Sequence, residues 1–365
     1  MRALVTALMV LIAAPAQAGD AVERLVSRHI ETILGDAGGA AVALRIDGRT
    51  RFFNYGFADK AKQRPVTPDV LFNLASAGKV FEATLFALAL KAGEIRFDDP
   101  VAKYIPELTG PDIRRITLGQ LAIHTSGLLL RQDYPPWPDE EFTQDEFIAM
   151  LNAWKAPRAP GAVREYTNAG YVLLQLALSR RFGEQAGALI DRRILAPLAM
   201  SSTATPLRPG ADPRGTLPDE LKARAAQGYT RYGEPIGAPG DVQGYYVWHG
   251  TGQMFSSARD MAVFLAANMG EVPAEPALKE AMALAQRNAF TVIPGVEQAL
   301  AWERLTMDGI TVVDKLGGLD DTSTYIGMVP DKKLGLVILS NRGFQDAAEA
   351  GRRILRELAR QMPEH

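Results

Sequence analysis

Strand-like segments lie near both ends of this chain of 365 residues, and helical segments lie between them. Near the start, AAVALRIDG and RTRFFNYGFAD predict a hairpin around Asp47-Gly48. Near the end, WERLTMD, GITVVDKLG, STYIGMVP and KLGLVILSN predict an antiparallel meander with a turn at Pro330-Asp331. One antiparallel sheet built from both ends, flanked by helices and with a mainly helical insertion, accounts for this order. We therefore predict an α+β fold rather than a parallel doubly wound sheet.

Apolar periodicity and end residues indicate the helices. Gly93 follows a segment rich in Ala, Leu and Phe, and Ser257 is a plausible N-cap. The expected helices cover residues 20–35, 77–92, 257–269 and about 347–361, with mainly helical signals from 112 to 200 and Gly- and Pro-rich loops with short strands from 201 to 245. We accordingly divide one domain, residues 19–365, into a sheet region (19–75 and 220–365) and a mainly helical region (76–219).

The N-terminus has the pattern of a secretory signal. Arg2 precedes an apolar run that ends at Ala14, and Ala16-Gln17-Ala18 provides an A-x-A cleavage site. The apolar run is shorter than the roughly 20 residues that span a bilayer. We expect residues 1–18 to be a cleaved signal peptide. The mature chain would then be periplasmic or secreted, without stable membrane insertion.

Composition excludes several classes of function. A net charge of −2 gives no bulk electrostatic attraction to nucleic acid. The absence of cysteine excludes disulfides, thiolate metal sites and cysteine nucleophiles, and only four histidines are present. We therefore expect no cofactor and no metal, although carboxylate sites for hard ions stay possible. The expected partner is a small-molecule or peptide substrate, and the sequence does not indicate an oligomeric state.

Ser76-Ala77-Gly78-Lys79 is the first candidate for chemistry, at the start of the predicted 77–92 helix. Residues three apart share a helix face, so the Lys79 amine can approach the Ser76 hydroxyl. A serine becomes a nucleophile when a base removes its proton, and a buried, neutral lysine can be that base. Such a pair also arises by chance, so this motif alone is weak.

Tyr166-Thr167-Asn168 and Lys315-Leu316-Gly317-Gly318 are the second and third candidates. A tyrosine near two lysines could act partly as a phenolate base, and Asn168 could bind a substrate amide. Lys315 could fix a polar substrate group, and the two glycines would let backbone amides approach a reacting carbonyl. Lys333-Leu334-Gly335 repeats the tripeptide pattern, so this signal is also weak alone.

Other hydrolase patterns fit less well. No serine lies in a G-x-S-x-G elbow, which argues against an α/β-hydrolase. His124 could belong to a triad, but a role in stabilising a loop is favoured. His249 lies in a glycine-rich stretch that could line a cleft, and we also favour a structural role for it.

Taken together, Ser76-x-x-Lys79, Tyr166-x-Asn168 and Lys315-x-Gly317 resemble the motifs of class C β-lactamases and their relatives, in order and approximate spacing. Those relatives include D-Ala-D-Ala peptidases, D-aminopeptidases and serine esterases. Segments such as ITLGQLAIHTSGL and PGAVREYTNAGYVLL are similar too, from about residue 36 to 360.

The resemblance implies an active site between the sheet and the helical region. It implies that Ser76 is the acylated nucleophile and that Lys79 and Tyr166 share proton transfer. Asn168 would contact the substrate amide, and Lys315 would hold Tyr166 and orient the substrate. The backbone amides of Ser76 and Gly318 would form the oxyanion hole.

The sequence departs from this family where the family binds a substrate carboxylate. Leu316 replaces a threonine, and a gapless count places Asp346 and Glu349 where class C enzymes carry an asparagine and an arginine. Two acidic groups would repel a carboxylate unless the loop shifts or Arg342 substitutes. We expect an exported serine hydrolase with altered substrate preference, acting on ester or amide substrates.

Two alternatives stay open. One is a true class C β-lactamase or D-Ala-D-Ala carboxypeptidase with another carboxylate anchor. The other is a penicillin-binding sensor domain that is acylated but does not hydrolyse the acyl-enzyme. A pure binder would not need both Lys79 and Tyr166, which argues against the sensor.

Overall fold

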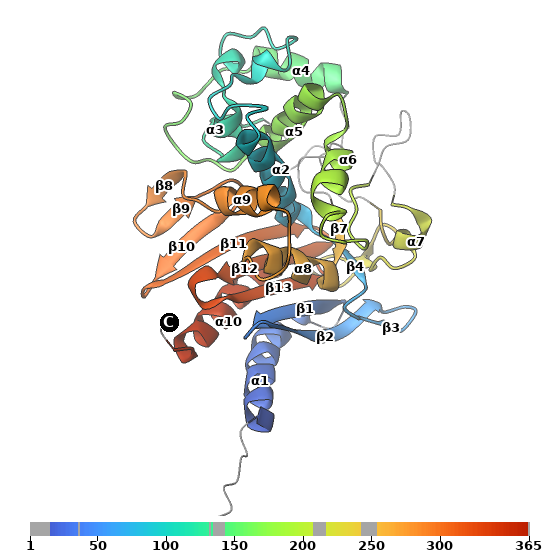
Figure 1. Cartoon of the computed structure of the whole chain (residues 1–365). Coiled ribbons are helices and arrows are strands. Elements are labelled where there is room, and N and C mark those ends of the chain that lie inside the picture. The colour runs from blue at the N-terminus through green and yellow to red at the C-terminus, as the bar shows by residue number, and fades with distance from the viewer. Residues whose placement is uncertain are drawn as a thin grey trace, which may run out of the picture.

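The computed structural model describes residues 15–35, 37–130, 133, 143–206, 217–241 and 254–363. Its centre is a nine-stranded antiparallel sheet (Figure 1). In spatial order the strands are β3 (Arg64–Pro65), β2 (Arg49–Asp59), β1 (Gly39–Ile46), β13 (Leu334–Ser340), β12 (Thr322–Val329), β11 (Ile310–Leu319), β10 (Glu303–Met307), β9 (Val296–Gln298) and β8 (Phe290–Ile293). Two short ladders lie beside it: β4 (Leu71–Asn73) with β7 (Phe255–Ser257), and β5 (Gly228–Tyr229) with β6 (Pro235–Ile236).

The two ends of the chain meet in the middle of the large sheet. Strand β1 pairs with β13, so Ala40 lies opposite Ser340. The β1–β2 hairpin turns at Asp47 and Gly48, whose φ angles of 52° and 69° suit a type I′ turn. Strands β10 to β13 form the meander. The predicted α+β fold, with one sheet built from both ends, is confirmed.

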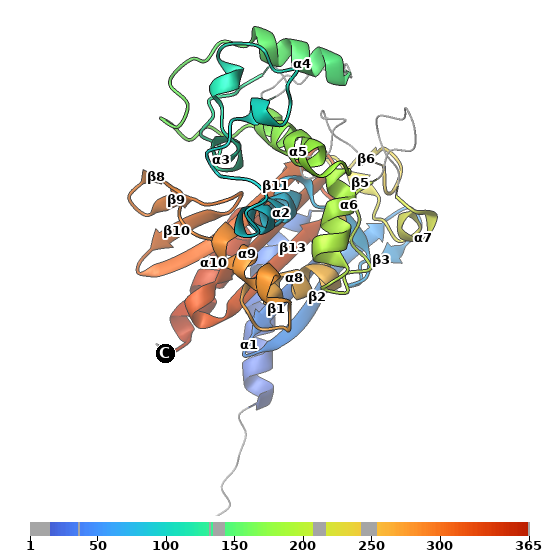
Figure 2. The same ribbon diagram turned by 45° about the horizontal axis from the view of Figure 1, so that its top comes forward.

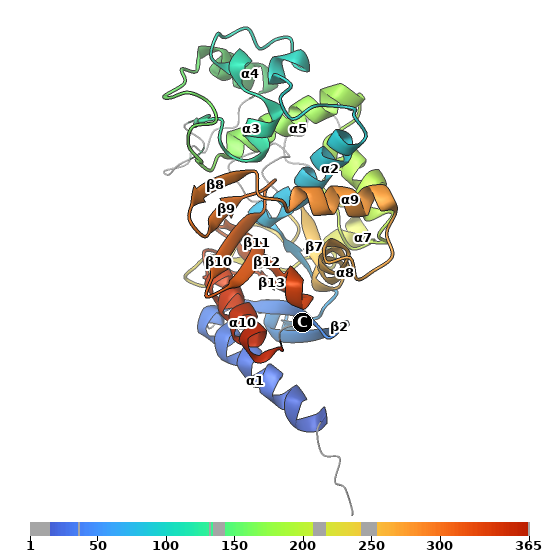
Figure 3. The ribbon, with the colours of Figure 1, turned by 60° about the vertical axis from the view of Figure 1, so that its left-hand side comes forward.

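Helices cover both faces of the sheet and build a second region. Helices α1 and α10 pack together on one face (Figure 3), and α8, α9 and α2 lie on the other. Helices α3 to α5 lie beyond α2 in the upper part of Figures 1 and 2. The helices are α1 (Pro15–Leu34), α2 (Lys79–Lys91), α3 (Leu118–Ala122), α4 (Gln144–Ala153), α5 (Asn168–Phe182), α6 (Ala186–Ile190), α7 (Asp219–Lys222), α8 (Ala258–Asn268), α9 (Pro276–Ala285) and α10 (Ala347–Gln361).

Three features differ from the predicted elements. The segment expected as one helix from residue 77 begins as a 3₁₀ turn, Ala75–Gly78, and α2 starts at Lys79. Helix α9 and the β8–β9 hairpin were not predicted. Helix α1 already begins at Pro15, and residues 1–14 of the expected signal lie outside the described residues. No helix in the described part of the chain is long and apolar enough to cross a membrane.

A buried ion pair fixes α10 to strand β11. The Arg352 guanidinium donates two hydrogen bonds to Asp314, from Nε at 2.6 Å and from an Nη at 3.0 Å. The Tyr325 hydroxyl also donates to Asp314, at 3.0 Å. Burial raises the Asp314 pKa, and Arg352 opposes that rise. Because side chains alternate along a strand, this contact also directs Lys315 to the opposite face, toward the helical region.

Replacing Arg352 with alanine should strongly destabilise the protein, because it leaves the Asp314 carboxyl buried without its cation. Removing one partner of a buried pair costs about 3–5 kcal/mol. Urea unfolding would measure this loss. The matched control is Arg353→Ala, since the neighbouring Arg353 pairs with Glu349 at the surface. That change should alter the free energy of unfolding by less than about 0.5 kcal/mol. Equal losses in both variants would contradict a structural role for the Arg352–Asp314 pair.

Candidate active site

Ser76 lies in a strained turn between strand β4 and helix α2. The preceding residue, Ala75, has a φ of 46°, in the left-handed region that favours glycine. The Asn73 side chain accepts a hydrogen bond from the Ala75 amide at 2.9 Å and stabilises this conformation. Non-glycine residues held in such a conformation cluster at functional sites. The turn leaves Ser76 partly exposed while its neighbours are buried.

The sheet holds this turn through two threonine hydroxyls. Thr322 donates to the Asn73 carbonyl at 2.9 Å, and Thr324 donates to the Leu74 carbonyl at 2.7 Å. Strand β11 also comes close, because a Cβ atom on Gly317 would lie 2.3 Å from the Leu74 carbonyl oxygen. Gly317 is therefore needed for close packing of the strand against the turn. Neither threonine was predicted from the sequence, where their signal is the alternating T-S-T on β12.

Lys79 is fully buried beside Ser76. Its ammonium nitrogen, Nζ, lies 3.2 Å from Ser76 Oγ and 3.0 Å from Asn168 Oδ1. Burial lowers the Lys79 pKa to about 7, although Glu82 and Asp133 raise it. An appreciable fraction of this lysine is thus a neutral amine at neutral pH. The predicted approach of Lys79 to Ser76 is present in the structure.

Tyr166 completes the contact with Ser76. Its hydroxyl donates to Ser76 Oγ at 2.7 Å, and its ring centroid lies 4.7 Å from Lys315 Nζ and 5.4 Å from Lys79 Nζ. Burial nevertheless raises the Tyr166 pKa, and Lys315 only partly opposes this effect. This direction does not favour the expected partial phenolate, because desolvation outweighs the charge of Lys315. It favours the protonated hydroxyl, which donates to Ser76 Oγ.

Asp133 positions the segment that carries Tyr166 and Asn168. Its carboxylate accepts hydrogen bonds from the backbone amides of Asn168 and Ala169, at the first turn of α5. Thr167 is the N-cap of the same helix and accepts from the Gly170 amide at 3.1 Å. Carboxylates at a helix N-terminus are favoured by the helix dipole. Asp133 was not predicted, because it lies far from Asn168 in the sequence.

His124 supports the other side of Tyr166. The two rings lie 4.4 Å apart, and His124 Nδ1 accepts from the Thr167 amide at 3.3 Å. The His124 carbonyl accepts from the Glu165 amide at 2.7 Å. Burial and the positive charge of Lys315 keep the His124 pKa well below its usual value, so the ring is neutral. These contacts agree with a loop-stabilising role. His249 lies outside the described residues.

Lys315 extends from β11 toward Tyr166 and is almost fully buried. Its charge and that of Arg164 lower the Glu303 pKa against the effect of burial. Arg164 also donates to Glu303 at 2.7 Å, which links the segment before Tyr166 to the sheet. Lys333, in the second K-L-G tripeptide, is exposed in a turn. A Cβ atom on Gly318 would meet only Phe344 among the described residues, so the space around Gly318 is open.

The loop after β13 lies against this edge of the site. The Gln345 amide donates to the hydroxyl of Ser323, which is paired with Gly318 across the sheet. Directly behind this loop, Asp346 caps α10 by accepting from the Glu349 amide at 3.1 Å. These two acidic residues therefore lie at the N-terminus of α10.

Arg342 does not replace a missing carboxylate anchor. Its guanidinium donates to the backbone carbonyls of Leu34 and Arg231, at 2.7 Å each. The side chain therefore joins the end of α1 to the end of β13. The suggestion that Arg342 substitutes for the family's arginine is not supported by this position.

Comparisons with known proteins agree with this architecture. The profile of the Beta-lactamase family matches residues 26–360. A beta-lactamase from Pseudomonas fluorescens is 27% identical over 89% of this chain and 95% of its own length. A beta-lactamase from Escherichia coli (strain K12) is 29% identical over 94% of each chain.

Solved structures give the same result. The D-alanine carboxypeptidase AmpC from Burkholderia cenocepacia matches with a TM-score of 0.79 and 26% identity, over 93% of this chain and 99% of its own. A class C beta-lactamase matches with a TM-score of 0.80 and 25% identity, over 96% of this chain and 98% of its own. The fold is therefore that of class C beta-lactamases.

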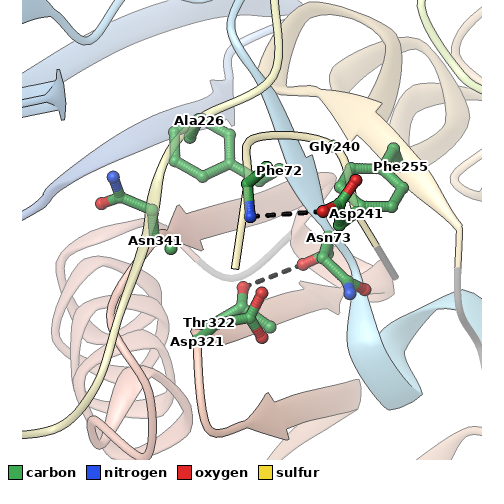
Figure 4. Close-up of a pocket in the computed structure, with 11 residues that line it drawn as sticks. Phe72, Asn73, Ala226, Gly240, Asp241, Phe255, Asp321, Thr322 and Asn341 are labelled. Carbon is green, nitrogen blue, oxygen red and sulfur yellow. Dashed lines mark hydrogen bonds between the residues drawn. The ribbon is translucent and has the colours of Figure 1, made fainter. Parts of the chain in front are cut away.

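A small polar cavity lies behind the Ser76 turn. Figure 4 shows Asn73, Asp241, Asp321 and Asn341 among the residues that line it. The Asp321 side chain is 7% exposed, and its Oδ1 has no hydrogen-bond partner among the described residues. Burial raises the Asp321 pKa to about 7, and the charge of Asp320 adds to the rise. A neutral carboxyl group is therefore favoured in the folded protein.

Asp321→Asn should remove part of the pH dependence of stability. The Asp321 pKa rises from 3.8 in the unfolded chain to about 7 on folding. Below about pH 4 the carboxyl is protonated in both states, and the folded protein has its full stability from this group. As the pH rises to about 7, the unfolded chain loses this proton before the folded protein does, and the free energy of unfolding falls by up to about 4 kcal/mol. The variant should therefore gain stability relative to wild type between pH 4 and pH 8 in urea unfolding. Asp331→Asn, in an exposed turn, is the control. If the difference in unfolding free energy between Asp321→Asn and wild type stays constant from pH 4 to pH 8, the burial of a neutral carboxyl is contradicted.

Proposed function

The chain belongs to the beta-lactamase family of serine hydrolases, and on this premise we propose that Ser76 forms an acyl-enzyme with ester or amide substrates. One observation carries the assignment: Ser76 Oγ lies within hydrogen-bond distance of both Tyr166 Oη and Lys79 Nζ. A nucleophile in contact with a base and with a second proton-carrying group is the arrangement that acyl transfer requires.

Lys79 is proposed as the base of acylation. As Ser76 Oγ bonds to the substrate carbonyl carbon, the hydroxyl proton passes to the neutral Lys79 amine, and the carbonyl oxygen becomes an oxyanion. The pKa of Lys79, lowered to about 7 by burial, suits this role at neutral pH. Tyr166 donates to Ser76 Oγ. As the bond to the leaving group breaks, Tyr166 is placed to give its proton to that group and to receive the proton that Lys79 took, so that the hydroxyl and the neutral amine are both restored.

The substrate is held by groups around Ser76. Asn168 is proposed to bind a substrate amide, and Lys315 to hold Tyr166 and orient the substrate. The backbone amides of Ser76 and Gly318 are proposed as the oxyanion hole. The open space beside Gly318 supports this assignment, since a reacting carbonyl needs room there.

We also propose that the preferred substrates lack a carboxylate beside the scissile bond. At the edge next to Gly318, Leu316 is 40% exposed and Phe344 is 49% exposed. Asp346 and Glu349 lie at the N-terminus of α10, which follows Phe344 in the chain, and the Arg342 guanidinium is bonded to backbone carbonyls away from this edge. This edge offers apolar and acidic groups, which favour neutral substrates such as esters.

The similar proteins include beta-lactamases and a D-alanine carboxypeptidase, so weak turnover of either substrate class is compatible with the site. The A-x-A pattern at residues 16–18 supports export to the periplasm or beyond the cell.

Ser76→Ala should abolish hydrolysis of a p-nitrophenyl ester and covalent labelling by a fluorophosphonate probe. The reason is that the Ser76 hydroxyl contacts both Lys79 Nζ and Tyr166 Oη. Labelling would be measured by intact-protein mass spectrometry. Ser201→Ala, at an exposed serine outside the site, should label fully. Stoichiometric labelling of Ser76→Ala would disprove the nucleophile assignment.

The combined change Leu316→Thr, Asp346→Asn and Glu349→Arg should improve turnover of substrates with a carboxylate. Asparagine caps helices as well as aspartate does, so α10 should persist. A charge-assisted hydrogen bond is worth about 1.5–3 kcal/mol, which corresponds to roughly a ten- to hundredfold rise in kcat/KM for a cephalosporin. Activity on a neutral p-nitrophenyl ester should stay flat or fall. Equal improvement on both substrates, or wild-type cephalosporin turnover near the diffusional limit, would refute the altered preference.

A further inference from the structure

We propose that Glu82 is a positioning residue for proton transfer: its carboxyl group sets how readily Lys79 accepts the proton of Ser76. The inference rests on the proposed role of Lys79 as the base. Glu82 lies outside the Ser-Lys, Tyr-Asn and Lys-Gly motifs, and it touches none of the reacting atoms. It would act only through its charge on the lysine.

The placement of Glu82 is the first support. It follows Lys79 by three residues on α2, so the two side chains project from the same helix face. Glu82 is 3% exposed and Lys79 is 0% exposed. Glu82 Oε2 has no hydrogen-bond partner among the described residues. Buried carboxyl oxygens normally have such partners, so this one requires an explanation.

The mutual effect of the two charges is the second support. Burial raises the Glu82 pKa to about 8, and Lys79 opposes the rise. Burial lowers the Lys79 pKa to about 7, and Glu82 is the first group that opposes the fall, followed by Asp133. Tyr171, from α5, also faces Glu82, and burial keeps its pKa well above the usual value, so it stays neutral. Each group thus shifts the proton affinity of the other, as interacting titratable groups do.

A consequence for catalysis follows from this pairing. Desolvation alone would leave Lys79 a weak base, because its amine would hold a proton poorly. A general base works best when its pKa is close to the working pH. When Lys79 takes the proton of Ser76, the new ammonium is fully buried, and it favours the charged form of Glu82, one turn further along the same helix. To the extent that its carboxyl is charged, Glu82 would raise the affinity of the buried amine for this proton.

The test is Glu82→Gln, which keeps the shape of the side chain and removes its charge. In the pH profile of kcat/KM for a neutral p-nitrophenyl ester, the acidic limb should shift to lower pH by about one unit. The plateau kcat should fall a few-fold, because the amine becomes a weaker base, and KM should not change. Glu82→Asp, which keeps a carboxyl group, should return the limb toward the wild-type position. Thermal unfolding would confirm that each variant is folded.

A direct titration separates this inference from the proposed base role. The Lys79 amine would be followed by NMR in wild type, Glu82→Gln and the control Thr84→Val. Thr84 lies on the same buried helix, and its hydroxyl donates to the Val80 carbonyl. A lower Lys79 pKa in Glu82→Gln alone, with a matching shift of the rate profile, supports the inference. An unchanged Lys79 pKa overturns it. A lower pKa with an unmoved rate profile would show instead that Lys79 is not the base.

Discussion

Full burial of the Lys79 amine is the constraint on which the rest of the site depends. A charged lysine is costly in an apolar interior, and its pKa falls until the neutral amine is accessible. This requires α2 to be surrounded by packed elements, which explains why the helix is apolar on nearly every side. Hydrogen bonds to Ser76 and Asn168 then satisfy the amine. The same burial that stabilises the core thus lowers the pKa of the proposed base.

Strand β11 links that core to the sheet through the alternation of its side chains. Asp314 points toward α10 and binds Arg352, whereas Lys315 points toward Tyr166. Gly317 lets the strand approach the Ser76 turn, which an alanine Cβ would obstruct. A shift of one residue in the register would exchange the two faces and place the aspartate in the site. Pairing of β1 with β13 extends this sheet to both chain ends and contributes to a fixed register.

The sequence predicts features that depend on local patterns, and it fails for features that depend on depth of burial. The hairpin, the meander and the order of Ser76, Lys79 and Tyr166 follow from periodicity and motif spacing. The raised pKa of Tyr166 does not, because desolvation there exceeds the effect of Lys315. Arg342 bonds a carbonyl 308 residues away in the sequence, which no local pattern indicates. Asp133 was missed for the same reason, since its contacts with α5 exist only in the folded chain.

The two lysines of the proposed site are buried, whereas the residues proposed to contact the substrate at the edge beside Gly318 are exposed. Lys79 and Lys315 are buried, so most substitutions there would disturb packing as well as catalysis. Leu316 and Phe344 are largely exposed at the edge beside Gly318, where a substitution changes contacts with a substrate but few contacts within the core. Exposed positions usually tolerate replacement with small effects on stability. Selection can therefore alter such an edge while the buried residues stay unchanged, which is the combination that we propose for this chain.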